Sequence, residues 1–217
     1  MSHKSGAVLL DMDGLMLDTE RPVVDLWIQA SANLGWTISR ETVYRIIGIN
    51  EASSRAVLAD AYGAEFPYTE IKNELFRLIY DTVEKTGIPC RPGLITLLDH
   101  LDTLKIPVAV ATSTDRQQAL WKLEKAGIRS RLPVVVCGDE VEHGKPAPDI
   151  FLLAAKKLGA EAACCIGFED SPAGLRSLAA AGIRSVFVKD LLDPPPEIMA
   201  TVWRQYDSLV EAIELFS

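Results

Sequence analysis

Short apolar runs alternate with helical patterns along most of the chain. Five runs have the length and the Val, Ile, Leu and Ala content of strands buried in a parallel sheet: Ala7 to Leu10, Pro107 to Ala111, Val134 to Cys137, Ala163 to Ile166 and Ser185 to Val188. Between these runs, leucines and alanines recur at helical spacing, and Gly127, Gly159 and Gly182 follow three of these stripes as helix stops. Strands that alternate with helices in this way predict an α/β fold with a doubly wound parallel sheet.

The region from about residue 18 to residue 86 departs from this alternation, because it contains no convincing strand. Its apolar spacing predicts four helices, at about 20–34, 40–47, 51–62 and 68–86, with Gly35, Gly48 and Gly63 as breakers. We therefore expect an all-α insert at 18–86 in an α/β core made of residues 1–17 and 87–217. Near the end of the chain, Pro194-Pro195-Pro196 predicts a rigid connection before a final helix at about Asp207 to Leu215.

The composition indicates a folded protein and argues against nucleic acid and membrane as partners. The chain has 217 residues, of which 48% are hydrophobic, and this is too apolar for disorder as the main state. A net charge of −8 argues against general nucleic-acid binding, which needs a basic face. No apolar run approaches the ~20 residues of a membrane span, and the polar start Met1 to Gly6 does not resemble a signal peptide. The four cysteines form no C-x-x-C pair, so we expect reduced thiols in a cytoplasmic protein without a membrane partner.

Polar side chains follow the predicted strands, where ligands bind in an open α/β sheet. The segments are Asp11-Met12-Asp13-Gly14, Thr112-Ser113-Thr114, Lys145-Pro146 and Glu169-Asp170-Ser171. Several carboxylates in one crevice repel one another unless a cation binds, and Mg²⁺ prefers such oxygen ligands. A lysine and a threonine hydroxyl are suitable donors to a phosphate. These residues together predict a magnesium and phosphate site.

Each segment taken alone has an ordinary structural explanation. An Asp-x-Asp sequence is usually a turn or a helix start, a lysine before proline is usually on the surface, and Thr114 or Asp115 suits a helix N-cap. We expect one of the two side chains of Asp11 and Asp13 to face the metal and substrate, while the other residue offers its backbone carbonyl to the metal and keeps its side chain for proton transfer. The order of the four segments, each after a strand, favours the functional interpretation.

With these segments in this order, the chain resembles the haloacid dehalogenase superfamily, in the helical-cap subgroup that includes β-phosphoglucomutase and many small phosphatases. The first motif matches Asp11 to Glu20, the second matches Thr112, the third matches Lys145 to Asp149 and the fourth matches Gly167 to Gly174. The resemblance spans essentially the whole chain. It implies a Rossmann-like core and makes residues 18–86 the cap.

The resemblance implies a role for each residue that matches a motif. Asp11 would attack phosphorus and form an aspartyl-phosphate, and Asp13 would protonate the leaving oxygen and then activate water. Thr112 and the backbone amide of Ser113 would bind phosphoryl oxygens. Lys145 would neutralise charge between the nucleophile and the phosphate, and its bond to Pro146 would be cis.

The resemblance also implies the cofactor and the class of substrate. Mg²⁺ would be held by Asp11, the backbone carbonyl of Asp13 and Asp170, with Glu169 ligating directly or through water. The expected enzyme is a phosphoric monoester hydrolase that acts on a small phosphorylated metabolite. We expect a monomer or a weak homo-oligomer.

Single residues argue for or against three other functions of this fold. Asp13 argues against dehalogenation, because a carbon–halogen substrate needs no acid at that position. A β-phosphoglucomutase would place His at Val23 and a phosphate-gripping Arg at Glu51, in the loop Gly48-Ile49-Asn50-Glu51, where an anionic side chain would repel a second phosphate. We therefore predict a phosphatase, with a phosphosugar mutase as the alternative. A non-catalytic phosphate-binding protein is a further alternative, which the retained carboxylates disfavour.

Overall fold

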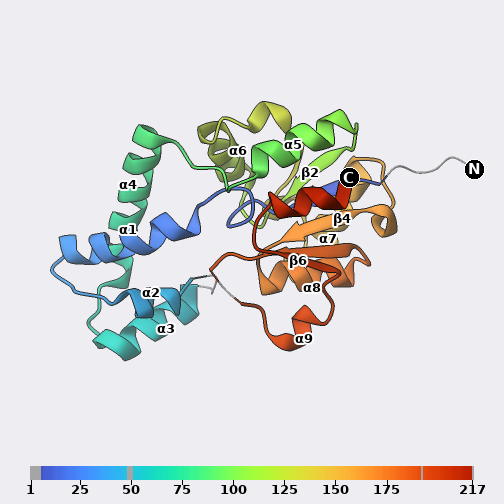
Figure 1. Ribbon diagram of the computed structural model, residues 1–217. Helices are drawn as coiled ribbons and strands as arrows, with labels where there is room; N and C mark the ends of the chain where they lie inside the picture. Colours follow the sequence, from blue (N-terminus) through green and yellow to red (C-terminus); the bar gives the residue numbers. More distant parts are fainter. Residues whose placement is uncertain (1–5, 48–50, 192, 217) are drawn as a thin grey trace, which may run out of the picture. The chain divides into compact units, whose positions relative to one another are not determined.

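A single parallel sheet forms the centre of the larger part of the protein. The computed structural model describes residues 6–47, 51–191 and 193–216 (Figure 1). Within them, six strands lie in the order β3-β2-β1-β4-β5-β6, with every neighbouring pair parallel. The strands are β1 (Val8–Leu10), β2 (Val108–Ala111), β3 (Val134–Val136), β4 (Ile166–Glu169), β5 (Arg184–Val188) and β6 (Arg204–Tyr206). The order runs outward in both directions from β1 and β4, which confirms the predicted doubly wound α/β fold.

Helices cover both faces of this sheet. The α-helices of this part are α5 (Leu94–Thr103), α6 (Arg116–Lys125), α7 (Asp149–Lys157), α8 (Pro172–Ala180) and α9 (Pro196–Met199), and the 3-10 helices are η1 (Arg129–Arg131), η2 (Gly138–Glu140), η3 (Ala162–Cys164) and η4 (Glu211–Phe216). On one face Leu9 and Ala109 belong to a buried cluster with Phe151 of α7. On the other face Phe168 stacks on Phe216 of η4, with the ring centroids 6.3 Å apart. Burial on both faces explains why these strands read as continuous apolar runs.

Strand β4 begins three residues later than the sequence predicts. The expected strand was Ala163 to Ile166, but Ala162–Cys164 form the turn η3, and the strand runs over Ile166–Glu169. Gly167 lies inside it because α8 packs closely there, and a Cβ at this position would overlap the side chain of Leu178. Glu169 is therefore the last residue of the strand rather than a residue of the loop after it.

The end of the chain also differs from the prediction. The final helix expected at Asp207 to Leu215 is wrong, because the described segment there contains only the 3-10 helix η4. The strand β6 precedes it and was not predicted. Its residues Arg204 and Gln205 are exposed and only Tyr206 is buried, so this edge strand lacks the apolar run that marks the inner strands.

The chain divides into two compact units, one made of residues 1–18 and 88–217 and the other of residues 19–87. The second unit contains α1 (Glu20–Asn33), α2 (Arg40–Tyr44), α3 (Glu51–Tyr62) and α4 (Tyr68–Thr86), and no strand lies among its described residues. Helix α2 ends earlier than expected, Gly35 and Gly63 adopt positive φ after α1 and α3, and Gly48 lies outside the described residues. Trp27 packs on Tyr68, with ring centroids 6.0 Å apart.

The two chain segments that lead into and out of the second unit are paired within the first. Leu17 and Cys90 form an isolated antiparallel bridge, and the amide of Asp18 donates to the carbonyl of Pro89 at 2.9 Å. The chain therefore leaves the α/β unit and returns to it at neighbouring points. None of the described helices is both long and apolar enough to span a membrane.

Candidate active site

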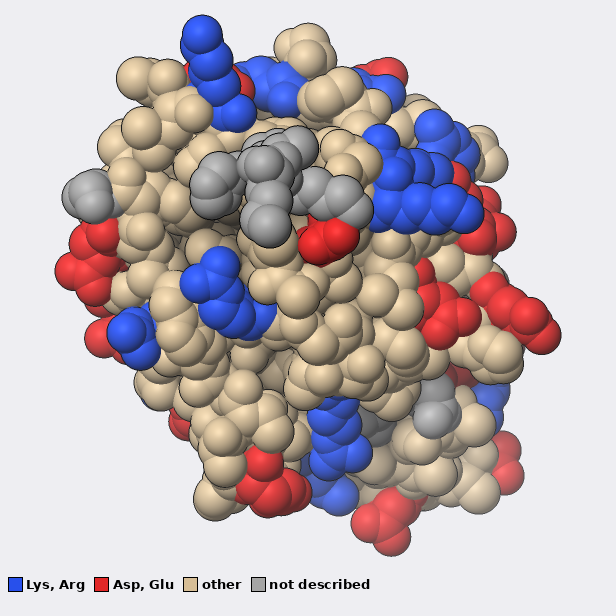
Figure 2. All heavy atoms as spheres, turned by 90° about the vertical axis from the view of Figure 1, so that its right-hand side faces the viewer, with Lys and Arg blue, Asp and Glu red and all other residues tan. Residues whose placement is uncertain are grey.

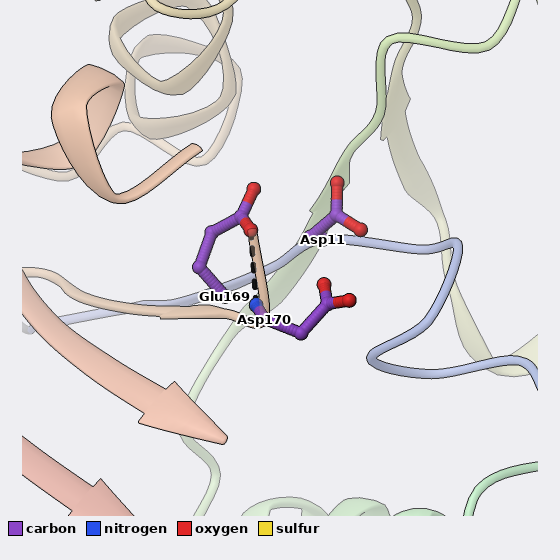
Figure 3. Close-up of side chains that lie close together, drawn as sticks. All are labelled: Asp11, Glu169 and Asp170. Carbon is purple, nitrogen blue, oxygen red and sulfur yellow. Dashed lines mark hydrogen bonds between the residues drawn. The ribbon is translucent and has the colours of Figure 1, made fainter. Parts of the chain in front are cut away.

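The topology brings Asp11, Glu169 and Asp170 together. Strands β1 and β4 are neighbours in the sheet, with Leu10 paired to Phe168, so Asp11 lies beside the end of β4. The amide of Asp11 donates to the carbonyl of Phe168 at 3.1 Å. The strand order reverses between β1 and β4, and this is the point where open α/β sheets bind ligands at the carboxyl ends of their strands. Figure 3 shows the three side chains at this position.

The three carboxylates form a buried cluster of oxygen ligands. One oxygen atom from each of Asp11, Glu169 and Asp170 lies within 4.8 Å of the other two. Burial raises the pKa of Asp11 to about 8, because desolvation and the charge of Glu169 outweigh the lowering effect of Lys145. A cation at this cluster would stabilise the ionised form of Asp11.

Lys145 lies between two of these carboxylates. Its Nζ donates to Asp11 Oδ1 and to Glu169 Oε1, the latter at 2.6 Å, and its side chain is 5% exposed. Burial alone would lower the pKa of Lys145, but the neighbouring Asp11 and Glu169 raise it above its ordinary value. The Lys145–Pro146 peptide bond is cis, as the resemblance implied. The lysine is thus held as a cation beside Asp11.

Hydrogen bonds occupy both carboxylate oxygens of Glu169. Oε1 accepts from Lys145, while Oε2 accepts from the amide of Asp170 at 3.0 Å, the amide of Ser171 at 2.8 Å and the Ser171 hydroxyl at 2.9 Å. Figure 3 shows the first of these backbone contacts as a dashed line. Gly174 leaves the space for this carboxylate, because a Cβ there would overlap it. Glu169 therefore fixes Lys145 and the start of the following loop.

Asp13 lies apart from the buried cluster and has its own donors. Lys122 Nζ donates to Asp13 Oδ1 at 2.6 Å, and the Thr114 hydroxyl donates to Oδ2 at 2.8 Å. The Asp13 side chain is 26% exposed, against 11% for Asp11. The next residue, Gly14, has a φ of +86°, and a Cβ there would overlap the carboxylate of Asp170. The two aspartates of the first motif thus occupy different environments.

The loop after β2 carries the predicted phosphate-binding residues. Thr112 is 1% exposed, and its Oγ1 accepts from the amide of Thr114 at 3.1 Å. Ser113 is exposed, and Gly138 packs so closely below its carbonyl that a Cβ would overlap it. Asp115 is the N-cap of α6, since its carboxylate accepts from the amide of Gln118 at 3.0 Å. Of the two residues considered for the N-cap, Thr114 instead contacts Asp13.

An ion pair that the sequence did not suggest lies near the same strand ends. Asp190 follows β5, its side chain is 1% exposed, and its Oδ1 lies 2.9 Å from an Arg91 guanidinium nitrogen. Arg91 also donates to the carbonyl of Lys189 at 3.1 Å, and its amide donates to the carbonyl of Met16 at 2.8 Å. Arg91 therefore ties the loop after β1 to the loop after β5.

Comparison with known proteins gives the family. The family model of haloacid dehalogenase-like hydrolases matches residues 6–182. Hexitol phosphatase A of Escherichia coli is 34% identical over 190 residues, which are 86% of this chain and 84% of the relative. The phosphorylated carbohydrates phosphatase of Thermotoga maritima is 28% identical over 184 residues, 83% of each chain.

A solved structure extends the likeness to the fold. A Thermotoga maritima protein to which the activity of β-phosphoglucomutase has been provisionally assigned superposes with a TM-score of 0.83 at 25% identity, and the match covers 97% of this chain and 98% of the other. The chain therefore belongs to the haloacid dehalogenase-like hydrolases, which confirms the resemblance, the fold class and the assignment as a hydrolase that we drew from the motifs.

Proposed function

We propose that the protein is a magnesium-dependent phosphatase that hydrolyses the phosphoric monoester of a small metabolite through an aspartyl-phosphate on Asp11. The observation that carries the proposal is the buried contact of Asp11 with Lys145, at the point of the sheet where Asp170 also lies. A carboxylate nucleophile beside a fixed cation suits attack on a phosphoryl group, whose reaction depends on positioning and on charge neutralisation. The named phosphatases among the relatives support the same class of reaction.

The residues at this site fit a magnesium ion. The donor atoms of Asp11 and Asp170 are buried carboxylate oxygens, the ligands that Mg²⁺ prefers. We propose that these two residues and the backbone carbonyl of Asp13 hold the ion, with Glu169 acting through water because both of its oxygens already accept hydrogen bonds. When bound, Mg²⁺ supplies positive charge beside the phosphoryl oxygens and favours the ionised form of Asp11.

In the proposed reaction Asp11 is the nucleophile, Asp13 transfers protons, and three further groups hold the phosphoryl oxygens. An Asp11 oxygen attacks phosphorus, the bond from phosphorus to the ester oxygen breaks, and that oxygen takes a proton from Asp13. Lys145, the Thr112 hydroxyl and the amide of Ser113 hold the phosphoryl oxygens. Asp13 then accepts a proton from water, which attacks the aspartyl-phosphate and releases inorganic phosphate.

We also propose that the helical unit is the cap that selects the substrate. The sequence places its boundaries at 18–86, and the contact division of the structure lies at 19–87. The names of the two relatives, a hexitol phosphatase and a phosphorylated carbohydrates phosphatase, favour a phosphorylated sugar or sugar alcohol as the substrate class. Basic and acidic side chains are interspersed on the face shown in Figure 2, which agrees with a small substrate rather than a nucleic acid.

The direct test is phosphate release from p-nitrophenyl phosphate and from a panel of sugar and polyol phosphates, with and without Mg²⁺. The Asp11→Asn variant should lose turnover because the attacking oxygen is replaced by an amide, and the exposed Asp99→Asn serves as the matched control. Near-normal phosphate release by Asp11→Asn would show that another group is the nucleophile. Turnover that is insensitive to metal removal would contradict the magnesium site.

The similarity to an assigned β-phosphoglucomutase keeps a phosphosugar mutase as the second candidate. The sequence argument against it relied on the charge of Glu51, but that carboxylate is paired with Lys72 Nζ at 2.6 Å and with Arg55 at 3.3 Å, so the repulsion it offers is smaller than we expected. The test supplies β-glucose 1-phosphate with a trace of the bisphosphate. A phosphatase releases free phosphate, whereas accumulation of glucose 6-phosphate ahead of phosphate identifies a mutase.

A further inference from the structure

We propose that Lys122, together with Thr114, is the positioning residue for the proton-transfer carboxylate of Asp13. The inference rests on the proposed function, in which Asp13 protonates the ester oxygen as it leaves. Neither residue belongs to the set that the motifs identified as catalytic or phosphate-binding. In the structure Lys122 Nζ donates to Oδ1 of Asp13, and the Thr114 hydroxyl donates to Oδ2.

The position of Lys122 on α6 explains how it reaches Asp13. The helix starts at its Asp115 cap, and Ala119 and Leu123 form its buried side. Lys122 is adjacent to this buried side, and its side chain is only 21% exposed, so most of its aliphatic stem is covered while Nζ contacts the carboxylate. Thr114 and Lys122 lie on the same loop and helix after β2, so a single segment presents both donors.

Each of the two aspartates of the first motif contacts a different lysine. Lys145 contacts Asp11 and Glu169 in the buried cluster, and Lys122 contacts Asp13 at its more exposed edge. Thr114 connects the regions, because its amide donates to the Thr112 hydroxyl while its own hydroxyl donates to Asp13. The phosphate-binding loop and the proton-transfer carboxylate are therefore held in one fixed arrangement.

A positional role predicts a loss that depends on the leaving group. An alkyl phosphate such as glycerol 1-phosphate has a poor leaving group, an alkoxide, which needs the proton from Asp13. The p-nitrophenolate of p-nitrophenyl phosphate leaves with little help from an acid. A Lys122→Met variant removes the charge but keeps an unbranched side chain of similar length. It should lower kcat/KM for glycerol 1-phosphate at least about tenfold more than kcat/KM for p-nitrophenyl phosphate, within the range of general acid catalysis. The loss should appear mainly in kcat, and Lys122→Arg should restore part of it.

Two further variants separate this role from its alternatives. Thr114→Val should give a smaller loss with the same dependence on the leaving group, and Lys122→Met added to Asp13→Asn should cause little further loss. Lys156→Met, an exposed lysine of α7, is the matched control, and melting temperatures verify that each variant is folded.

The outcomes distinguish the proposal from the function on which it rests. Wild-type protein that hydrolyses neither ester contradicts the proposed function itself. Equal losses for the two esters, a change confined to KM, or a full additional loss in the Asp13→Asn background would show that Lys122 binds substrate or supports the fold, and would overturn the positioning role.

Discussion

At the scale of single residues, Asp11 combines a buried carboxyl group with a proposed task that requires it to be ionised. Its pKa of about 8 lies well above the value of 3.8 that applies to an ordinary aspartate. Between these two values the folded protein keeps a proton that the unfolded chain has lost, so stability falls as the pH rises from about 4 to 8.

This sign gives a test in metal-free buffer. Because Asp11→Asn cannot ionise, the melting temperature of the variant should exceed that of the wild type by more at pH 8 than at pH 5. Mg²⁺ should raise the wild-type melting temperature more at pH 8, and it should raise that of Asp11→Asn little. Thermal denaturation followed by fluorescence measures both differences. A gap between the two proteins that does not change with pH contradicts the assigned environment of Asp11.

Substitution of Gly174 tests how much space surrounds the Glu169 carboxylate. The Gly174→Ala variant places a methyl group where the Glu169 carboxylate lies, so the carboxylate must move and its contact with Lys145 is disturbed. Overpacking of this kind destabilises a protein by about 1–3 kcal/mol, and phosphatase turnover should fall as Lys145 loses its support. Urea denaturation and kcat report the two effects. The control is Gly144→Ala, where an added Cβ meets open space, and equal behaviour of the two variants would mean that Glu169 has room to shift.

At the scale of the elements, the sequence predicted those parts whose pattern comes from burial. The inner strands lie between two helical layers and are apolar throughout, while α1, α3 and α4 have regular apolar spacing, so their ranges were close to those observed. Strand β4 was shifted because its Gly167 is dictated by contact with Leu178, which no local pattern reveals. Strand β6 was missed because backbone pairing, rather than side-chain burial, holds its polar residues in the sheet.

The same reasoning separates the predicted and missed parts of the site. Asp11, Glu169 and Asp170 come together because the ends of the neighbouring strands β1 and β4 meet, and Lys145 reaches them from the longer segment after β3. Lys122 lies within a helix, where its spacing resembles that of any surface lysine. Its contact with Asp13 depends on the packing of α6, so only the structure could identify it.

The pairing of Arg91 with Asp190 links two loops and gives a prediction at this scale. Replacing Arg91 with Leu leaves the buried Asp190 carboxylate without this partner, and loss of one member of a buried ion pair costs about 3–5 kcal/mol. The urea midpoint should fall accordingly. Arg91→Leu combined with Asp190→Leu should recover part of the loss, because the buried carboxylate at position 190 is removed as well. A urea midpoint of Arg91→Leu close to that of the wild type would show that this ion pair contributes little to stability.

At the scale of the whole molecule, each of the two compact units has buried hydrophobic residues. The α/β unit is organised around the buried sheet, and the helical unit has its own buried residues, among them Val24, Ala30, Leu58 and Ile71. Each of the strand-end residues of the candidate site belongs to the α/β unit. We therefore expect the α/β unit to assemble these residues by itself, and we propose that the helical unit selects the substrate.

A deletion tests this independence. Residues 19–87 are replaced by Gly-Asn-Gly, which closes the short antiparallel pair of Leu17 with Cys90 and Asp18 with Pro89 by a tight turn. The remaining chain should unfold cooperatively and bind Mg²⁺, and it should hydrolyse p-nitrophenyl phosphate without preference among sugar phosphates. Circular dichroism and calorimetry follow the first two properties. A product with no cooperative transition would show that the α/β unit depends on the helices for its stability.

The paired segments around Leu17 and Cys90 also bear on how such a protein diversifies. Because the excursion from 19 to 87 starts and ends at adjacent backbone positions, its length and helix number can change without altering the register between β1 and β2. Under the role that we propose for the helical unit, mutations there would change the substrate while the groups proposed to break the phosphate ester stay in place. After gene duplication, changes confined to residues 19–87 could therefore give a new specificity, because the proposed catalytic residues lie in the other unit and need not change.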